Sequence, residues 1–365
     1  MYIKQLDAVR GFAALYVVLH HLQKSSPFID SPLVTYLLSF GQEAVIVFFI
    51  LSGFVIYLSS YKKKLSFQDY FYKRFFRIYP PFLIAILVSV LVSYSNGNLS
   101  SNFSAMELLG NLLMLQDGAS KPGVAVDNFL GNYSLWSLSY EWWFYILFFP
   151  IQKHLIDNRN LYYYICAFSI ASYFSYLLVP NKISLVSSYF VVWWCGIELA
   201  KLFVHRKKIV FGNTKHILSV LLFMSALTLV PVLNADTIRF GIYPFLIFRH
   251  FFSASFIISV SILWLKNNGK FFEITIGKFS FLAPISYAIY VFHVPILLQW
   301  DLSKYLPNQI GELAIKFAIL FALSYLVEVH LQKKINHFVK KYLLSTRQHY
   351  KDTINGLIHN KLLSK

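Results

Sequence analysis

The feature of this sequence that most restricts its fold is a series of apolar stretches, each about as long as the roughly 20 residues that an α-helix needs to cross a lipid bilayer. Hydrophobic side chains make up 57% of the 365 residues and charged side chains only 13%, a composition that water-soluble domains do not have. We therefore expect an all-α fold, an integral membrane bundle of about ten transmembrane helices. The predicted spans are residues 8–24, 41–60, 78–96, 135–152, 160–179, 185–203, 215–233, 242–265, 281–299 and 312–331.

The placement of the basic residues predicts how this bundle is oriented. A net charge of +17 would also suit a nucleic-acid-binding protein, but here the Lys and Arg residues gather in alternate loops. That asymmetry follows the positive-inside rule, so both termini are expected in the cytoplasm and no nucleic-acid partner is expected. The outward segments carry Lys24, Lys121, Lys182, Arg239 and Lys304. The inward loops carry Lys62, Lys63, Lys64, Lys73, Arg74, Arg77, Lys153, Arg159, Arg206, Lys207, Lys208, Lys215, Lys266, Lys270 and Lys278.

The first apolar stretch contains ionisable residues that a simple membrane anchor would lack, Arg10 and His21. A charged group near the bilayer centre costs a few kcal/mol, so such side chains usually face a protein interior or a wet cavity. The two residues are eleven positions apart, which is three helical turns plus about 20°, so both lie on one face, roughly 16 Å apart along the axis. Gly11, Ala13 and Ala14 would let another helix pack closely beside them.

Further polar motifs follow in the second, fourth and ninth spans and in the loop before the third span. They contain the pair Ser52 and Gly53, the pair Arg74 and Arg77, then Glu141, and finally Tyr290 and His293. The full stretches are Val45–Ile56, Tyr72–Pro80, Leu135–Tyr145 and Ser286–Pro295. In this order, together with the spacing of Arg10 and His21, they resemble the membrane acyltransferase-3 family over residues 6 to about 330. Members of that family have ten-helix cores and acylate, often acetylate, cell-surface sugars in bacteria.

The resemblance implies site residues and also shows departures. The family's arginine–histidine pair maps onto Arg10 and His21, and its Arg-x-x-Arg motif maps onto Arg74 and Arg77. The family's frequent Asp in the second span is Ile46 here, which puts an essential carboxylate at that place in doubt. Its Glu-x-Pro motif reads Glu328-Val329-His330, a change that affects the helix end. Some relatives carry a C-terminal esterase-like domain, whereas this chain is expected to consist of a transmembrane domain at 1–332 and a basic cytoplasmic tail at 333–365.

The predicted topology places these residues in two layers. Arg10, Arg74, Arg77 and Glu328 fall at the cytoplasmic end, where guanidinium groups suit the phosphates of acyl-coenzyme A. His21, Glu141 and His293 fall in the outer half. The pantetheine arm of the donor would then carry the thioester toward the second layer. We expect the first layer to border a cytoplasmic opening, the second to share one cavity, and Ser52, Gly53 and Tyr290 to line the site.

Transfer to a sugar hydroxyl requires a base, and His21, with a reference pKa near 6.5, is the candidate. Glu141 is expected to hold the imidazole tautomer, and Arg10 to support the site. The sequence alone does not distinguish a basic role of His21 from a role as acyl carrier. Structural explanations also stand: Arg10, Arg74 and Arg77 could serve orientation only, His21 could be an interfacial polar residue, and His293 could cap a network with Tyr290.

We therefore predict a multi-pass O-acyltransferase of a bacterial inner membrane. Its co-substrate would be acyl-CoA, with acetyl-CoA favoured, and its acceptor would be an envelope polysaccharide or a lipid-linked sugar. No metal and no bound cofactor are expected, and the remaining partner is the lipid bilayer. The main alternative is a transporter or flippase, in which the histidines and arginines form an ion or substrate path. A third possibility is a membrane scaffold without catalytic activity.

Overall fold

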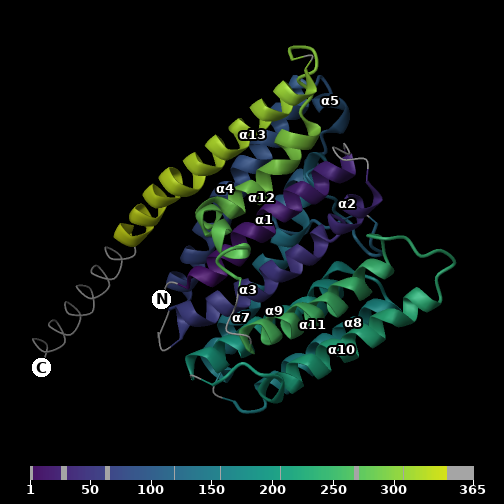
Figure 1. Ribbon diagram of the computed structural model, residues 1–365, viewed down its shortest axis with the longest axis vertical. Helices are drawn as coiled ribbons and strands as arrows, with labels where there is room; N and C mark the ends of the chain where they lie inside the picture. Colours follow the sequence, from purple (N-terminus) through teal and green to yellow (C-terminus); the bar gives the residue numbers. More distant parts are fainter. Residues whose placement is uncertain are drawn as a thin grey trace, which may run out of the picture.

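The computed structural model describes residues 3–25, 31–61, 66–118, 120–156, 158–205, 207–266, 271–306 and 308–342. Within these ranges the chain is helical and has no β-strand. Eight helices in the described ranges are long and apolar enough to cross a membrane. Figure 1 shows the long helices lying side by side as one bundle, with α13 along one edge and α8 and α10 along the opposite edge. The predicted all-α membrane bundle is confirmed.

Each of the predicted spans coincides with a helix. Two of these helices, α1 and α7, are 22 and 20 residues long and are not among the eight. The long helices are α1 (Lys4–Ser25), α3 (Gly41–Ser60), α4 (Phe67–Ser95), α7 (Trp136–Leu155), α8 (Leu161–Leu178), α9 (Lys182–Val204), α10 (Phe211–Leu233), α11 (Phe245–Lys266), the consecutive segments η3 (Ile276–Ile285), α12 (Ser286–His293) and η4 (Val294–Gln299), and α13 (Gln309–Tyr325) with η5 (Leu326–Leu331). Short helices between them are α2 (Pro32–Leu37), α5 (Leu99–Asn102), α6 (Ala105–Leu112), η1 (Phe129–Gly131) and η2 (Tyr133–Leu135).

Helix α4 differs from the prediction at its start. It begins at Phe67 rather than near residue 78, because Ser66 caps it by accepting a hydrogen bond from the backbone N–H of Asp69 at 3.1 Å. Arg74 and Arg77, expected in a loop, therefore lie on one face of a helix.

The last helix also extends beyond its predicted end, running without a break to Tyr342. The rest of the expected tail, residues 343–365, lies outside the described residues, as do Lys62, Lys63, Lys64, Arg206, Lys270 and the side chain of Lys266.

We refer to the two ends of the bundle by the terminal residues of α1, as the Lys4 end and the Ser25 end. The connection between α4 and α7 covers the Ser25 end, and a buried carboxylate holds it in place. The Asp117 carboxylate accepts hydrogen bonds from Lys121 at 2.6 Å, from Lys182 at 2.8 Å and from the Tyr140 hydroxyl at 2.7 Å. Burial alone would raise the pKa of the Asp117 carboxyl, but the two ammonium groups hold that pKa well below its usual range. The connection is thereby tied to α7 and α9.

Helices α3 and α9 cross at unusually close range because glycines face each other there. A Cβ atom on Gly53 would lie 2.1 Å from the carbonyl oxygen of Trp193, and one on Gly196 would lie 2.0 Å from that of Ile50. Gly53 was expected beside the site, where a small residue lets a ligand or another helix approach closely; here helix α9 uses that space. Gly11 of α1 lies in close contact with another helical segment, as its sequence predicts. A Cβ atom there would lie 2.1 Å from the carbonyl oxygen of Phe279 in η3.

Replacing Gly53 or Gly196 by alanine should force the backbones of α3 and α9 apart and destabilise the protein by about 1–3 kcal/mol. The effect is measured as a lower unfolding temperature of the purified protein in detergent. Gly212→Ala is the matched control, because nothing lies within 4 Å of the position of its Cβ. In that helix alanine should be neutral or stabilising by up to about 1 kcal/mol. Equal unfolding temperatures for all these variants would contradict the close crossing.

Candidate functional site

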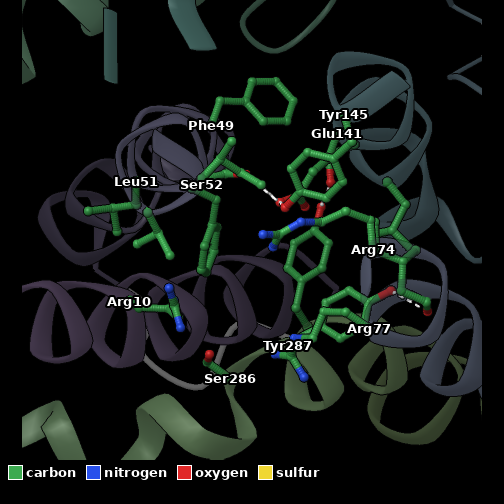
Figure 2. Close-up of a pocket in the computed structure, with 17 residues that line it drawn as sticks. Arg10, Phe49, Leu51, Ser52, Arg74, Arg77, Glu141, Tyr145, Ser286 and Tyr287 are labelled. Carbon is green, nitrogen blue, oxygen red and sulfur yellow. Dashed lines mark hydrogen bonds between the residues drawn. The ribbon is translucent and has the colours of Figure 1, made fainter. Parts of the chain in front are cut away.

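A cavity of about 210 Å³ lies in the half of the bundle nearer the Lys4 end, between α1, α3, α4, α7 and α12 (Figure 2). It is unusual for the inside of an apolar bundle because its wall contains several guanidinium groups and a carboxylate. We call it the arginine cavity. Its polar lining residues are Arg10, Ser52, Arg74, Arg77, Ser137, Glu141, Tyr145, Ser286, Tyr287 and Tyr290.

The arginines of this cavity differ in how they are paired. Arg77 donates a hydrogen bond to Glu328, whose side chain is only 2% exposed, and its guanidinium lies 5.3 Å from the Tyr287 ring centre. Arg74 donates to the Ser59 hydroxyl at 3.0 Å. Arg10 has Asp7 at 3.9 Å. Among the described residues, only Arg77 of these three forms a close ion pair, so Arg10 and Arg74 keep donors for an anionic ligand.

Glu141 lies in the arginine cavity, where it forms a hydrogen-bonded network. Its carboxylate accepts hydrogen bonds from the Ser52 hydroxyl at 2.6 Å and from the Tyr145 hydroxyl. The Ser52 oxygen in turn accepts from the indole N–H of Trp193 at 3.1 Å. Figure 2 shows Ser52, Glu141, Tyr145 and Arg74 converging on the cavity from three helices. The network joins α3, α7 and α9 through one carboxylate.

A second cavity, of about 420 Å³, lies in the half nearer the Ser25 end. We call it the histidine cavity. The end of α1, the start of α3 and the connection before α7 form most of its wall, and exposed residues such as Lys24 lie at its rim. Its polar and aromatic lining residues are His20, His21, Lys24, Ser25, Gln42, Ser120, Lys121, Asn128, Tyr133, Ser134, Trp136 and Tyr290.

The imidazole of His21 lies between two other rings in this half. It stacks on His293 with ring centres 5.3 Å apart and planes 23° apart, and its centre lies 4.8 Å from that of Tyr133. His293 is fully buried, and its Nδ1 lies 2.7 Å from the carbonyl oxygen of Tyr290. Because a carbonyl oxygen can only accept, Nδ1 carries the hydrogen and Nε2 keeps its lone pair. That Nε2 has no hydrogen-bond partner among the described residues.

The expected grouping of His21, Glu141 and His293 in one cavity is wrong: of the three, only His21 lines the histidine cavity, and the fully buried His293 stacks on its ring without lining it. His21 and His293 are neighbours, but Glu141 lies with Arg10, Arg74 and Arg77. The reason is the rotation of α7, since Ser137 and Glu141 are one turn apart on the face toward the arginine cavity. Glu141 therefore does not orient the His21 imidazole.

The two cavities meet at Tyr290, the residue that both linings have in common. Its hydroxyl forms a 2.8 Å hydrogen bond with Ser137, and its backbone carbonyl accepts from His293. Tyr290, which was expected to line the site, is in the wall of both cavities. The sequence reasoning did not single out Ser137 and Tyr145. With Glu141 they repeat every four residues along α7, a spacing that marks one helix face.

Comparison with known proteins identifies relatives of the chain. The sequence matches a family described as an acyltransferase domain over residues 3–329. A curated relative, acyltransferase MdmB of Streptomyces mycarofaciens, is 34% identical over 178 residues. That match covers 47% of this chain and 44% of the relative, so the matched region spans less than half of the relative's length. No solved structure matches the chain.

Glu141→Ala should destabilise the protein by about 1–3 kcal/mol, because the hydroxyl groups of Ser52 and Tyr145 lose their acceptor. Glu141→Gln keeps an oxygen acceptor and should retain most of the stability. The unfolding temperatures of both variants in the same detergent measure the difference. Glu273→Ala is the control, since it removes only the exposed pair with Lys4 and should have little effect. Wild-type stability of Glu141→Ala would contradict the network.

Proposed function

Because the chain belongs to the acyltransferase-3 family, we propose that this membrane acyltransferase transfers an acyl group, with acetyl favoured, from cytoplasmic acyl-CoA to a hydroxyl of an envelope polysaccharide or a lipid-linked sugar. The observation that carries the proposal is the pair of polar cavities in opposite halves of the bundle, with Tyr290 as their common wall. A transferase with a donor on one side of a membrane and an acceptor on the other needs such an arrangement. The bacterial inner membrane, with both termini in the cytoplasm, is the setting that we propose.

The arginine cavity suits the anionic donor. We place the Lys4 end at the cytoplasmic surface, because the described basic residues Lys73, Lys153, Lys207 and Lys208 lie there, in keeping with the positive-inside rule. The planar guanidinium groups of Arg10 and Arg74 offer paired donors to phosphate oxygens. Arg77 is held by Glu328, and its side chain, which is 37% exposed, forms part of the cavity wall. The pantetheine arm would extend from these groups toward Tyr290.

The histidine cavity would hold the acceptor, with His21 as general base. The His21 imidazole takes the proton of the sugar hydroxyl while the hydroxyl oxygen attacks the thioester carbonyl. The new C–O bond forms as the C–S bond breaks, and the proton is then given to the coenzyme A thiolate. The stacked His293 fixes the plane of the His21 ring. Glu141 supports the donor side by holding Ser52 and Tyr145, rather than acting on His21.

Removing His21 should abolish transfer while leaving donor binding intact, because its ring lies in the other cavity from the arginines. We expect His21→Ala to lower the rate of acyl transfer by about 10²–10⁴-fold, the usual contribution of a general base. The dissociation constant of acetyl-CoA should stay within about twofold of wild type. His154→Ala, an exposed histidine at the end of α7, is the control. A wild-type rate in His21→Ala would exclude the role of His21.

Replacing Arg74 by lysine keeps the positive charge but removes the planar fork that binds phosphate through two donors. Arg74→Lys should therefore weaken acetyl-CoA binding by about tenfold, a loss of about 1.4 kcal/mol. The measurement is a binding titration with the protein in nanodiscs, with Lys207→Gln as a control at the same end of the bundle. If Arg74→Lys and Lys207→Gln both bind acetyl-CoA as tightly as the wild type, the positive charge of Arg74 serves only to orient the protein in the membrane.

A further inference from the structure

Among the described residues, the charged side chains that line the histidine cavity are all basic. Its wall contains the ammonium groups of Lys24 and Lys121 and the imidazoles of His20 and His21, whereas no Asp or Glu among the described residues lines it. The neutral polar residues Gln42 and Asn128 line the same space. A site of this kind repels cations and presents hydrogen-bond donors to an anion.

The fixed charges next to this cavity do not cancel. Lys121 and Lys182 share the single carboxylate of Asp117, which leaves one positive charge in that cluster. Lys24 is exposed at the rim and forms no ion pair with any described residue. The nearby Arg249 is neutralised by Glu43 at 2.5 Å. The surplus is therefore two positive charges, one at the rim and one in the wall, even with both histidines neutral.

The cavity also has the size and lining of a site for a small polar ligand. Its volume of about 420 Å³ falls within the range of about 300–1,000 Å³ typical of small-molecule sites. Tyr133 is 38% exposed and presents part of its ring beside His21. An aromatic face next to several hydrogen-bond donors suits a sugar ring, which has apolar and hydroxylated faces.

We propose that the histidine cavity takes an acidic sugar, one whose carboxylate or phosphate group binds near Lys24 and Lys121 and so presents a hydroxyl to His21. This inference rests on the proposed function and adds the chemical class of the acceptor. The positive surplus at the rim also attracts such an acceptor over a distance set by the ionic strength, about 8 Å in physiological salt.

The test measures sugar binding to the full-length protein in nanodiscs containing bound acetyl-CoA, by saturation-transfer NMR. Glucuronic and galacturonic acid form the carboxylate arm, glucose 1-phosphate forms the phosphate arm, and glucose and galactose are the neutral partners. We expect the acidic sugars of at least one arm to bind at least tenfold more tightly than their neutral partners. Raising the salt concentration should remove most of that preference. Equal binding of acidic and neutral sugars, or binding of neither, would overturn the proposal.

A charge reversal at the rim locates the effect. Lys24→Glu should remove the preference for acidic sugars, whereas Lys304→Glu, which changes a lysine of another connection outside the cavity lining, should keep it. Acetyl-CoA binding should be unchanged in both variants, because its proposed site is the other cavity. If Lys24→Glu keeps the preference, the anion does not bind here and the proposal fails. If the wild-type protein binds acetyl-CoA but binds acidic and neutral sugars equally, this inference alone is rejected. If the wild-type protein does not bind acetyl-CoA at all, the proposed function itself is rejected.

Discussion

The interaction on which the rest of the structure depends is the pairing of charged side chains inside an apolar bundle. Arg77 of α4 is bound to the buried Glu328 of η5, and the Glu141 carboxylate collects hydroxyl donors from α3 and α7. Asp117 does the same for the connection over the Ser25 end. An unpaired charge in lipid costs several kcal/mol, so each of these contacts fixes which helices can be neighbours. The polar cavities are the spaces that remain between the paired groups.

In this arrangement the arginine cavity and the histidine cavity have one lining residue in common, Tyr290. The arginine cavity is rich in guanidinium groups, and the histidine cavity is lined by His21, whose ring stacks on the buried His293. Tyr290 belongs to both walls, and its hydroxyl is hydrogen-bonded to Ser137 of the arginine cavity. In the proposed reaction the thioester and the hydroxyl meet at this tyrosine. In that proposed reaction, the separation of the two cavities would shield the thioester from water at the acceptor end.

The sequence predicts the helices better than it predicts their faces. Apolar length locates the helices, and the spacing of Arg10 and His21 correctly separates the residues of α1 between the two halves. It does not place Glu141, because the four-residue spacing of Ser137, Glu141 and Tyr145 shows that they share one face of α7 but not which cavity that face meets. Trp136 and Ser137 are adjacent in sequence, yet they line different cavities. The sequence also leaves open what lies beside Gly53, since either a ligand or a helix can use the space beside a glycine; the structure places helix α9 there.

The most direct test of the account is whether donor and acceptor act from opposite sides of the membrane. The protein is reconstituted into liposomes with the Lys4 end facing outward, labelled acetyl-CoA is added outside, and envelope oligosaccharides are either trapped inside or added outside. The two-cavity account predicts labelled oligosaccharide inside the liposomes and almost none when the oligosaccharide is outside. Labelling only of oligosaccharide on the same side as acetyl-CoA would contradict it, because both substrates would then use one entrance.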